Sequence, residues 1–132
     1  MALPKYGITR ELPDVSFEDA LERTTEALSE EGFGVLSEID VQETLKKKLD
    51  VDFRKYRILG ACNPPLAHQA LQGELYLGLL LPCNVIVMER KEGGSVVSAV
   101  RPTEMFNIVD NPQMAQLARD VQKKLDRVMD SL

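Results

Sequence analysis

The sequence predicts an α+β fold: a curved, mostly antiparallel sheet with two main helices packed on one face, plus short helices. Two long segments carry apolar residues at three- and four-residue spacing, which is typical of amphipathic helices. Several β-branched segments lie between them without alternating strictly with helices, which favours α+β over a doubly wound sheet. A chain of 132 residues without a low-complexity linker predicts one domain, residues 1–132.

The predicted helices are marked by their first residues. Ser16, with Asp19 three positions later, resembles a capping box, and Asp40 with Glu43 repeats the pattern. Asn-Pro pairs begin the other two, because an Asn cap followed by proline at the first helical position costs no hydrogen bond. Gly32 is the expected end of the first helix. The helices are expected at 17–31, 41–49, about two turns after residue 63, and 112–132.

The predicted strands follow from β-branched residues, period-two patterns and turn residues. Within the third, Gly60 is typical of a bulge or a close backbone approach. Residues 75–81 are apolar without a period, so a strand and buried irregular chain both remain open. Residues 102–109 are expected to be a connector that buries Met105, Phe106 and Ile108. The strands are expected at 5–12, 34–40, 54–62, 83–90 and 95–101, with a Gly93-Gly94 hairpin before the last.

Charge and hydropathy exclude several classes of partner. The net charge is −5, and the one basic run, residues 46–48, is flanked by acidic residues, so no nucleic-acid partner is expected. The most apolar window, residues 75–88, is shorter than the roughly 20 residues of a spanning helix, and no membrane partner is expected. Two cysteines in a chain without a visible secretory signal indicate free thiols and a cytoplasmic location.

One stretch concentrates the residues able to do chemistry. It holds both cysteines, Cys62 and Cys83, the single histidine, His68, and the helix cap Asn63. A helix N-terminus beside Cys62 favours a thiolate, and two thiols with an imidazole could bind a soft metal or form a nucleophile with its base. The alternative is two buried core thiols and a histidine on a helix surface. The spacing lacks C-x-x-C, so it gives a zinc-ribbon or thioredoxin-like site no support.

The motif I-L-G-A-C-N-P at residues 58–64, A-x-x-A-L at 67–71 and G-L-L-L-P-C-N-V at 78–85 resemble domain-of-unknown-function family 302. The resemblance covers nearly the whole chain. It implies a small α+β domain with a TATA-binding-protein-like arrangement of sheet and helices, and dimers. It does not imply DNA binding and brings no assigned activity, and the cofactor stays unknown.

The leading hypothesis for function is a cytoplasmic, homodimeric binding or assembly module with a small-ligand or soft-metal pocket near Cys62, His68 and Cys83. A homodimer is expected because residues 58–61, 85–88 and 96–100 are apolar on both faces, whereas two helices cover only one. The alternative is a thiol-dependent enzyme or redox protein with Cys62 as nucleophile. A third possibility is a structural partner domain without a ligand.

Overall fold

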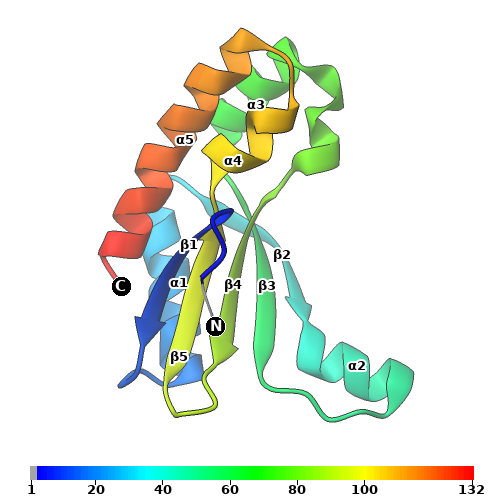
Figure 1. Ribbon diagram of the computed structural model, residues 1–132, viewed down its shortest axis with the longest axis vertical. Coiled ribbons are helices and arrows are strands. Elements are labelled where there is room, and N and C mark those ends of the chain that lie inside the picture. Colours follow the sequence, from blue (N-terminus) through cyan, green and yellow to red (C-terminus); the bar gives the residue numbers. More distant parts are fainter. Residues whose placement is uncertain (1–2) are drawn as a thin grey trace.

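The computed structural model describes residues 3–132, and their five strands form a single antiparallel sheet (Figure 1). The order across the sheet is β1-β5-β4-β3-β2, and every neighbouring pair is antiparallel. The α+β prediction is therefore confirmed. The strands are β1 (Gly7–Leu12), β2 (Gly34–Asp40), β3 (Tyr56–Cys62), β4 (Cys83–Glu89) and β5 (Ser95–Val100).

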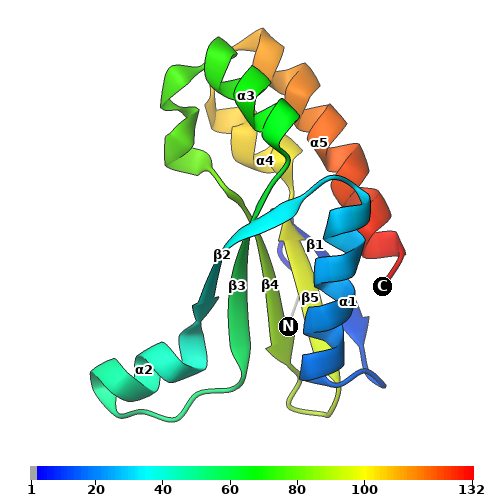
Figure 2. The same cartoon turned by 180° about the vertical axis from the view of Figure 1, so that it is seen from behind.

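Two long helices, α1 (Phe17–Glu30) and α5 (Pro112–Asp130), lie on the same side of the sheet (Figure 2). The strand register places Leu59, Val85 and Ala99 next to one another on that side, and each is at most 1% exposed. Successive residues of a strand point to opposite faces, so Ile58, Ile86 and Met88 lie on the other face. No helix of the described residues, 3–132, covers that second face (Figure 1), and these side chains remain half-buried.

Helix α1 is capped at both ends, by Ser16 at its start and by a turn through Gly32 at its end. Ser16 caps the start of α1, as predicted, by accepting the Asp19 N–H. At the other end Gly32 has φ +83°, a left-handed conformation that glycine adopts without steric cost. The N–H of Phe33 then returns to the carbonyl of Leu28 at 2.9 Å, the bond that defines a Schellman motif.

The first strand is tied to the end of the chain by one arginine. The Arg10 guanidinium donates to the carbonyl oxygens of Met129 at 2.9 Å and Leu132 at 3.2 Å. Because β1 is an edge strand whose one neighbour is β5, these bonds join the beginning of the fold to its last helical turn.

The two shorter helices differ in how they are held. Helix α2 (Val41–Leu49) begins and ends as predicted, but it has no buried residue and projects from the body of the molecule (Figure 1). Helix α3 (Pro64–Gly73) is longer than the two turns predicted, and its inner side packs beside α5. The N-cap prediction for Asn63 is confirmed, since its side chain accepts the Leu66 N–H.

The apolar stretch after α3 is neither a strand nor buried. It forms a 3₁₀ helix, η1 (Leu75–Leu80), in which Leu77 alone is buried, at 1% exposure. Leu75, Tyr76 and Leu79 are 76%, 76% and 84% exposed. Both predictions for this stretch are wrong because Leu77 anchors the segment, with Leu80 partly buried beside it, and the tight 3₁₀ turns point Leu75, Tyr76 and Leu79 outward.

The connector after β5 contains α4 (Pro102–Met105) and a short 3₁₀ turn, η2 (Phe106–Ile108). Phe106 is buried as predicted. Ile108 is 76% exposed, so its predicted burial is wrong. The turn directs Phe106 towards α5 and leaves Ile108 on the outside.

The apolar interior of residues 3–132 is divided into two clusters. The larger lies between the sheet, α1 and the C-terminal half of α5. The smaller lies beyond the end of the sheet, where η1, η2 and α3 meet the first half of α5. Its buried members are Ala70, Leu77, Phe106, Met114, Leu117 and Ala118. The seam between the two clusters is where the candidate site lies.

A bulge in β2 shapes one side of this seam. The β2–β3 register shifts between Val35 and Ser37, opposite Gly60. A side chain at Gly60 would collide with the Ser37 hydroxyl and with Pro82, so the glycine permits a close approach, as predicted. The bulge turns Leu36 outward, where it is 70% exposed.

Candidate functional site

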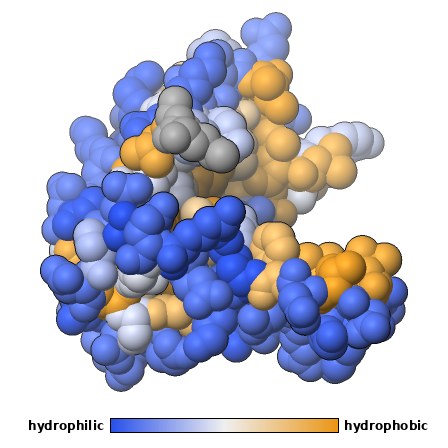
Figure 3. Space-filling model, turned by 60° about the horizontal axis from the view of Figure 1, so that its bottom comes forward, coloured by the Kyte–Doolittle hydropathy of each residue, from blue (hydrophilic) through white to orange (hydrophobic). Residues whose placement is uncertain are grey.

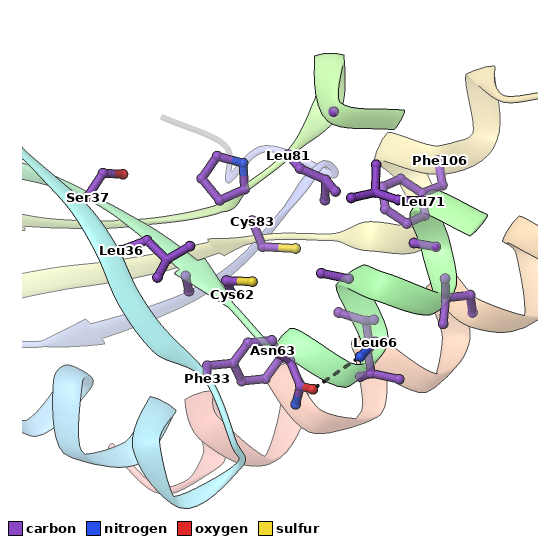
Figure 4. A pocket seen from close by; sticks show the side chains of 17 residues that line it. Phe33, Leu36, Ser37, Cys62, Asn63, Leu66, Leu71, Leu81, Cys83 and Phe106 are labelled. Carbon is purple, nitrogen blue, oxygen red and sulfur yellow. Dashed lines mark hydrogen bonds between the residues drawn. The ribbon is translucent and has the colours of Figure 1, made fainter. Parts of the chain in front are cut away.

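A cavity of about 430 Å³ lies at the seam between the two apolar clusters (Figure 4). Its walls come from the ends of β2, β3 and β4, the inner side of α3, η1 and α5. Both clusters contribute, since Phe33, Ala61 and Cys83 belong to the larger one and Ala70, Phe106 and Leu117 to the smaller. The lining residues are Phe33, Leu36, Ser37, Ala61, Cys62, Asn63, Leu66, Ala67, Ala70, Leu71, Gly78, Leu81, Pro82, Cys83, Phe106, Leu117 and Val121.

The lining is almost entirely apolar and contains no charged side chain. Asn63 is its one amide, and both ends of that amide have partners. The oxygen accepts the Leu66 N–H at 3.4 Å, and the NH₂ group donates to the Glu31 carbonyl at 3.2 Å. Apart from Ser37 at the exposed edge, the cavity therefore offers a ligand thiols and hydrocarbon.

The two thiols come from neighbouring antiparallel strands. Cys62 ends β3 and Cys83 begins β4, and both sulfur atoms point into the cavity (Figure 4). Both are free cysteines; Cys62 is half-buried and Cys83 is 6% exposed. Burial, with a smaller contribution from Cys62, raises the pKa of the Cys83 thiol from 9.0 to about 11. Cys83 is therefore a protonated thiol at neutral pH.

His68 lies outside the cavity. Leu66, Ala67, Ala70 and Leu71 are the residues of α3 that line it, and this helical phase turns His68 to the exposed side. The structure thus brings Cys62, Asn63 and Cys83 together and leaves the imidazole apart. Among residues 3–132, no three His, Cys, Asp or Glu side chains are grouped so that they could hold a metal ion. The hypothesis of a site built from both sulfurs and His68 therefore loses its third member, and the alternative of a histidine on the helix surface describes His68.

The start of α3 gives Cys62 no hydrogen-bond donor from its first turn. Its first two residues, Pro64 and Pro65, have no N–H, and the N–H of Leu66 is used by the Asn63 side chain. Free first-turn N–H groups are what make a helix N-terminus favourable for an anion. The expectation that α3 favours a thiolate at Cys62 therefore loses its physical basis.

Sequence reasoning missed much of the apolar wall. Phe33 directly precedes β2, Leu36 is the unpaired residue of the β2 bulge, and Phe106 and Leu117 reach the cavity from the other cluster. The bulge was signalled only indirectly, by Gly60 in the opposite strand. Nothing local in the sequence indicates that Phe106 and Leu71 line the same cavity, because only the tertiary arrangement brings η2 and α3 together.

The fold and the site together define a small antiparallel α+β domain with an apolar, thiol-containing cavity beyond one end of its sheet. The family model described as "Domain of unknown function DUF302" matches residues 8–132, and the chain belongs to this family. The crystal structure of the uncharacterized conserved protein DUF302 from Bacillus stearothermophilus is similar, with 29% sequence identity and a TM-score of 0.88. The similarity covers 97% of this chain and 98% of that one. No curated protein matches the chain.

The possibility of a membrane span can be tested directly on the helices. Within residues 3–132, none combines the length and the apolar character needed to cross a bilayer.

Proposed function

We propose that this protein is a non-enzymatic binding module that holds a small, uncharged, largely apolar molecule in the cavity between α3 and the strand ends. The observation that carries the proposal is the cavity itself. Its volume, about 430 Å³, lies within the range of small-molecule sites, and apolar walls with few polar groups are typical of them. A charged ligand would find no partner among the lining side chains, so its desolvation would be uncompensated.

A thiol-dependent enzyme or redox protein with Cys62 as nucleophile is the second candidate. The placement of Cys62 and Cys83 on one cavity wall favours it, because a bound molecule would contact sulfur (Figure 4). The other requirements of such an enzyme have less support. His68 lies on the exposed side of α3, away from the cavity, so it is not placed to serve as a base. No first-turn N–H of α3 is free to stabilise a thiolate. Binding without covalent chemistry therefore has the better support.

The proposal includes self-association in a reducing, cytoplasmic setting. Ile58, Ile86 and Met88 form an apolar stripe on the sheet face opposite α1 and α5, and a second copy is the proposed cover. The two free cysteines fit a compartment that keeps thiols reduced.

Binding can be tested with N-phenyl-1-naphthylamine, a neutral apolar dye whose fluorescence rises away from water. We expect the protein to bind it, and we expect Ala67→Phe to abolish binding, because Ala67 lines the cavity and a phenyl group would fill part of it. The matched control is His68→Phe, the same side chain placed one residue later on the exposed side of α3. Circular dichroism would verify that both variants are folded.

A second measurement locates the dye. Occupation of the cavity should slow alkylation of Cys62 by N-ethylmaleimide, since that sulfur points into the same space. Absence of dye binding, or equal loss of binding in the two phenylalanine variants, would contradict the proposed function. A Cys62→Ser variant that binds normally would separate binding from thiol chemistry.

A further inference from the structure

The mouth of the cavity has an apolar rim. Its two sides are Leu36, turned outward by the β2 bulge, and the exposed face of η1. Gly78 of η1 lines the cavity, and a Cβ at this position would meet no other atom within 4 Å, so the space beside it is open. On either side of Gly78 lie the side chains of Leu75, Tyr76 and Leu79, which are 76%, 76% and 84% exposed. The same short segment thus forms cavity wall on one side and exposed apolar surface on the other.

This rim is unusual for a pocket that takes its ligand from water. Leu36, Leu75, Tyr76 and Leu79 are each at least 70% exposed, and a group of exposed apolar side chains around an opening is typical of an interaction site. Apolar surface lies on both sides of the recess at the right of the space-filling view (Figure 3). An uncharged apolar ligand that passed from this surface into the cavity would meet no charged side chain among the lining residues.

We propose that the rim, Leu36 with Leu75, Tyr76 and Leu79, is a docking surface for a zwitterionic lipid bilayer. The inference that the cavity takes its ligand from that bilayer rests on the proposed function; the docking itself does not. The rim is distinct from the Ile58–Ile86–Met88 stripe proposed for the homodimer, which lies on the central strands.

Three features favour a bilayer over a protein partner. The rim surrounds an opening instead of forming a continuous face, and its four side chains are far fewer than the roughly 20–30 residues a side of a specific protein interface. Three of the four stand on a protruding 3₁₀ segment that could enter the interfacial region (Figure 1). It also includes a tyrosine, a residue that favours the boundary between headgroups and acyl chains.

The charges around the rim specify the lipid. Glu74 directly precedes η1, and the whole chain carries a net charge of −5. The basic run in α2 is engaged locally, since Lys46 pairs with Asp50 and Lys47 with Glu43. Anionic lipid should therefore weaken docking, and salt should affect docking to zwitterionic lipid little. The expectation of no membrane partner was based on the length of one apolar window, and docking at a bilayer surface needs no spanning helix.

The absence of tryptophan from the chain makes the test direct. In a Tyr76→Trp variant, the single indole should shift its emission to shorter wavelength with phosphatidylcholine vesicles and be quenched by lipids brominated on their acyl chains. In flotation with the same vesicles, Leu75→Ser/Leu79→Ser should lose roughly tenfold or more in partitioning, because two apolar side chains are removed from the contact. Leu49→Ser on α2, also an exposed leucine, is the matched control.

The outcomes separate the two proposals. The Leu75→Ser/Leu79→Ser variant should still bind N-phenyl-1-naphthylamine in the absence of vesicles, and Ala67→Phe should still float with them. Docking would be overturned by wild-type protein that does not float, by equal losses in the rim and Leu49 variants, or by binding only to anionic vesicles. It would also be overturned if the rim substitutions changed the sedimentation coefficient instead, since a second copy would then cover the rim.

Discussion

Asn63 connects the ends of two helices through one side chain. Its oxygen caps α3 and its NH₂ group donates to the Glu31 carbonyl at the end of α1. Replacing an Asn cap by Ala typically costs about 0.5–2 kcal/mol, so we expect Asn63→Ala to lower the free energy of unfolding by about 1–2 kcal/mol. Asn63→Asp keeps the acceptor and loses only the donor, so it should lower the free energy of unfolding by less than Asn63→Ala does. Urea midpoints that were the same for both variants would contradict this division of roles.

Cys83 should make stability depend on pH above neutrality. Burial raises the pKa of its thiol from 9.0 to about 11, so the folded state keeps the proton over a range in which the unfolded state has lost it. The stabilisation is complete below about pH 9 and is lost as the pH rises to about 11, a difference of about 2–3 kcal/mol. We expect urea titrations between about pH 9 and pH 11 to show a larger fall in the free energy of unfolding for wild-type protein than for Cys83→Ala. Parallel pH profiles would mean that the thiol is not buried.

At the scale of elements, the β4–β5 hairpin contains two adjacent glycines that differ in the space around their Cα atoms. Gly94 has φ +80°, and a Cβ there would collide with the carbonyl oxygens of Leu12 and Pro13. Gly93 has φ +101°, but a Cβ there would meet open space. Gly93→Ala should therefore cost only backbone strain, about 1–2 kcal/mol, whereas Gly94→Ala adds a collision with backbone and should cost clearly more. Measuring the thermal midpoints of the two variants tests whether the hairpin packs against the end of β1. Equal losses in the two variants would contradict that packing.

Elements with complete end signals were predictable, and those held by tertiary contacts were not. Ser16 and Gly32 fix α1 within one residue, and β2 and α2 have the predicted bounds. The η1 segment was misread because its apolar residues show no helical or strand period, although only Leu77 is fully buried and Leu80 partly so.

Part of the site was readable from the sequence and part was not. The phase of α3, with Leu66, Ala67 and Ala70 inward, already turned His68 outward, and Pro64-Pro65 already showed that the first turn lacks donors. The sequence does not predict that two apolar clusters line one cavity, because this arrangement depends on tertiary contacts such as that of α5 with α3.

At the scale of the whole molecule, the uncovered sheet face predicts a homodimer. We expect sedimentation to show a dimer at micromolar concentration, and Met88→Lys to weaken it by at least about tenfold, because a buried unpaired charge is costly. Gln69→Lys, on the exposed side of α3, should leave the association unchanged. A wild-type monomer at that concentration would refute the prediction.

The bonds from Arg10 to the carbonyls of Met129 and Leu132 have a consequence for how the protein is made. Within this domain, β1 is synthesised before its strand partner β5 and before the helical turn that Arg10 holds. The amphipathic helix α1 therefore emerges before the sheet on which it packs is complete. The β1–β5 pair and the Arg10 bonds can form only once residues 95–132 have been synthesised.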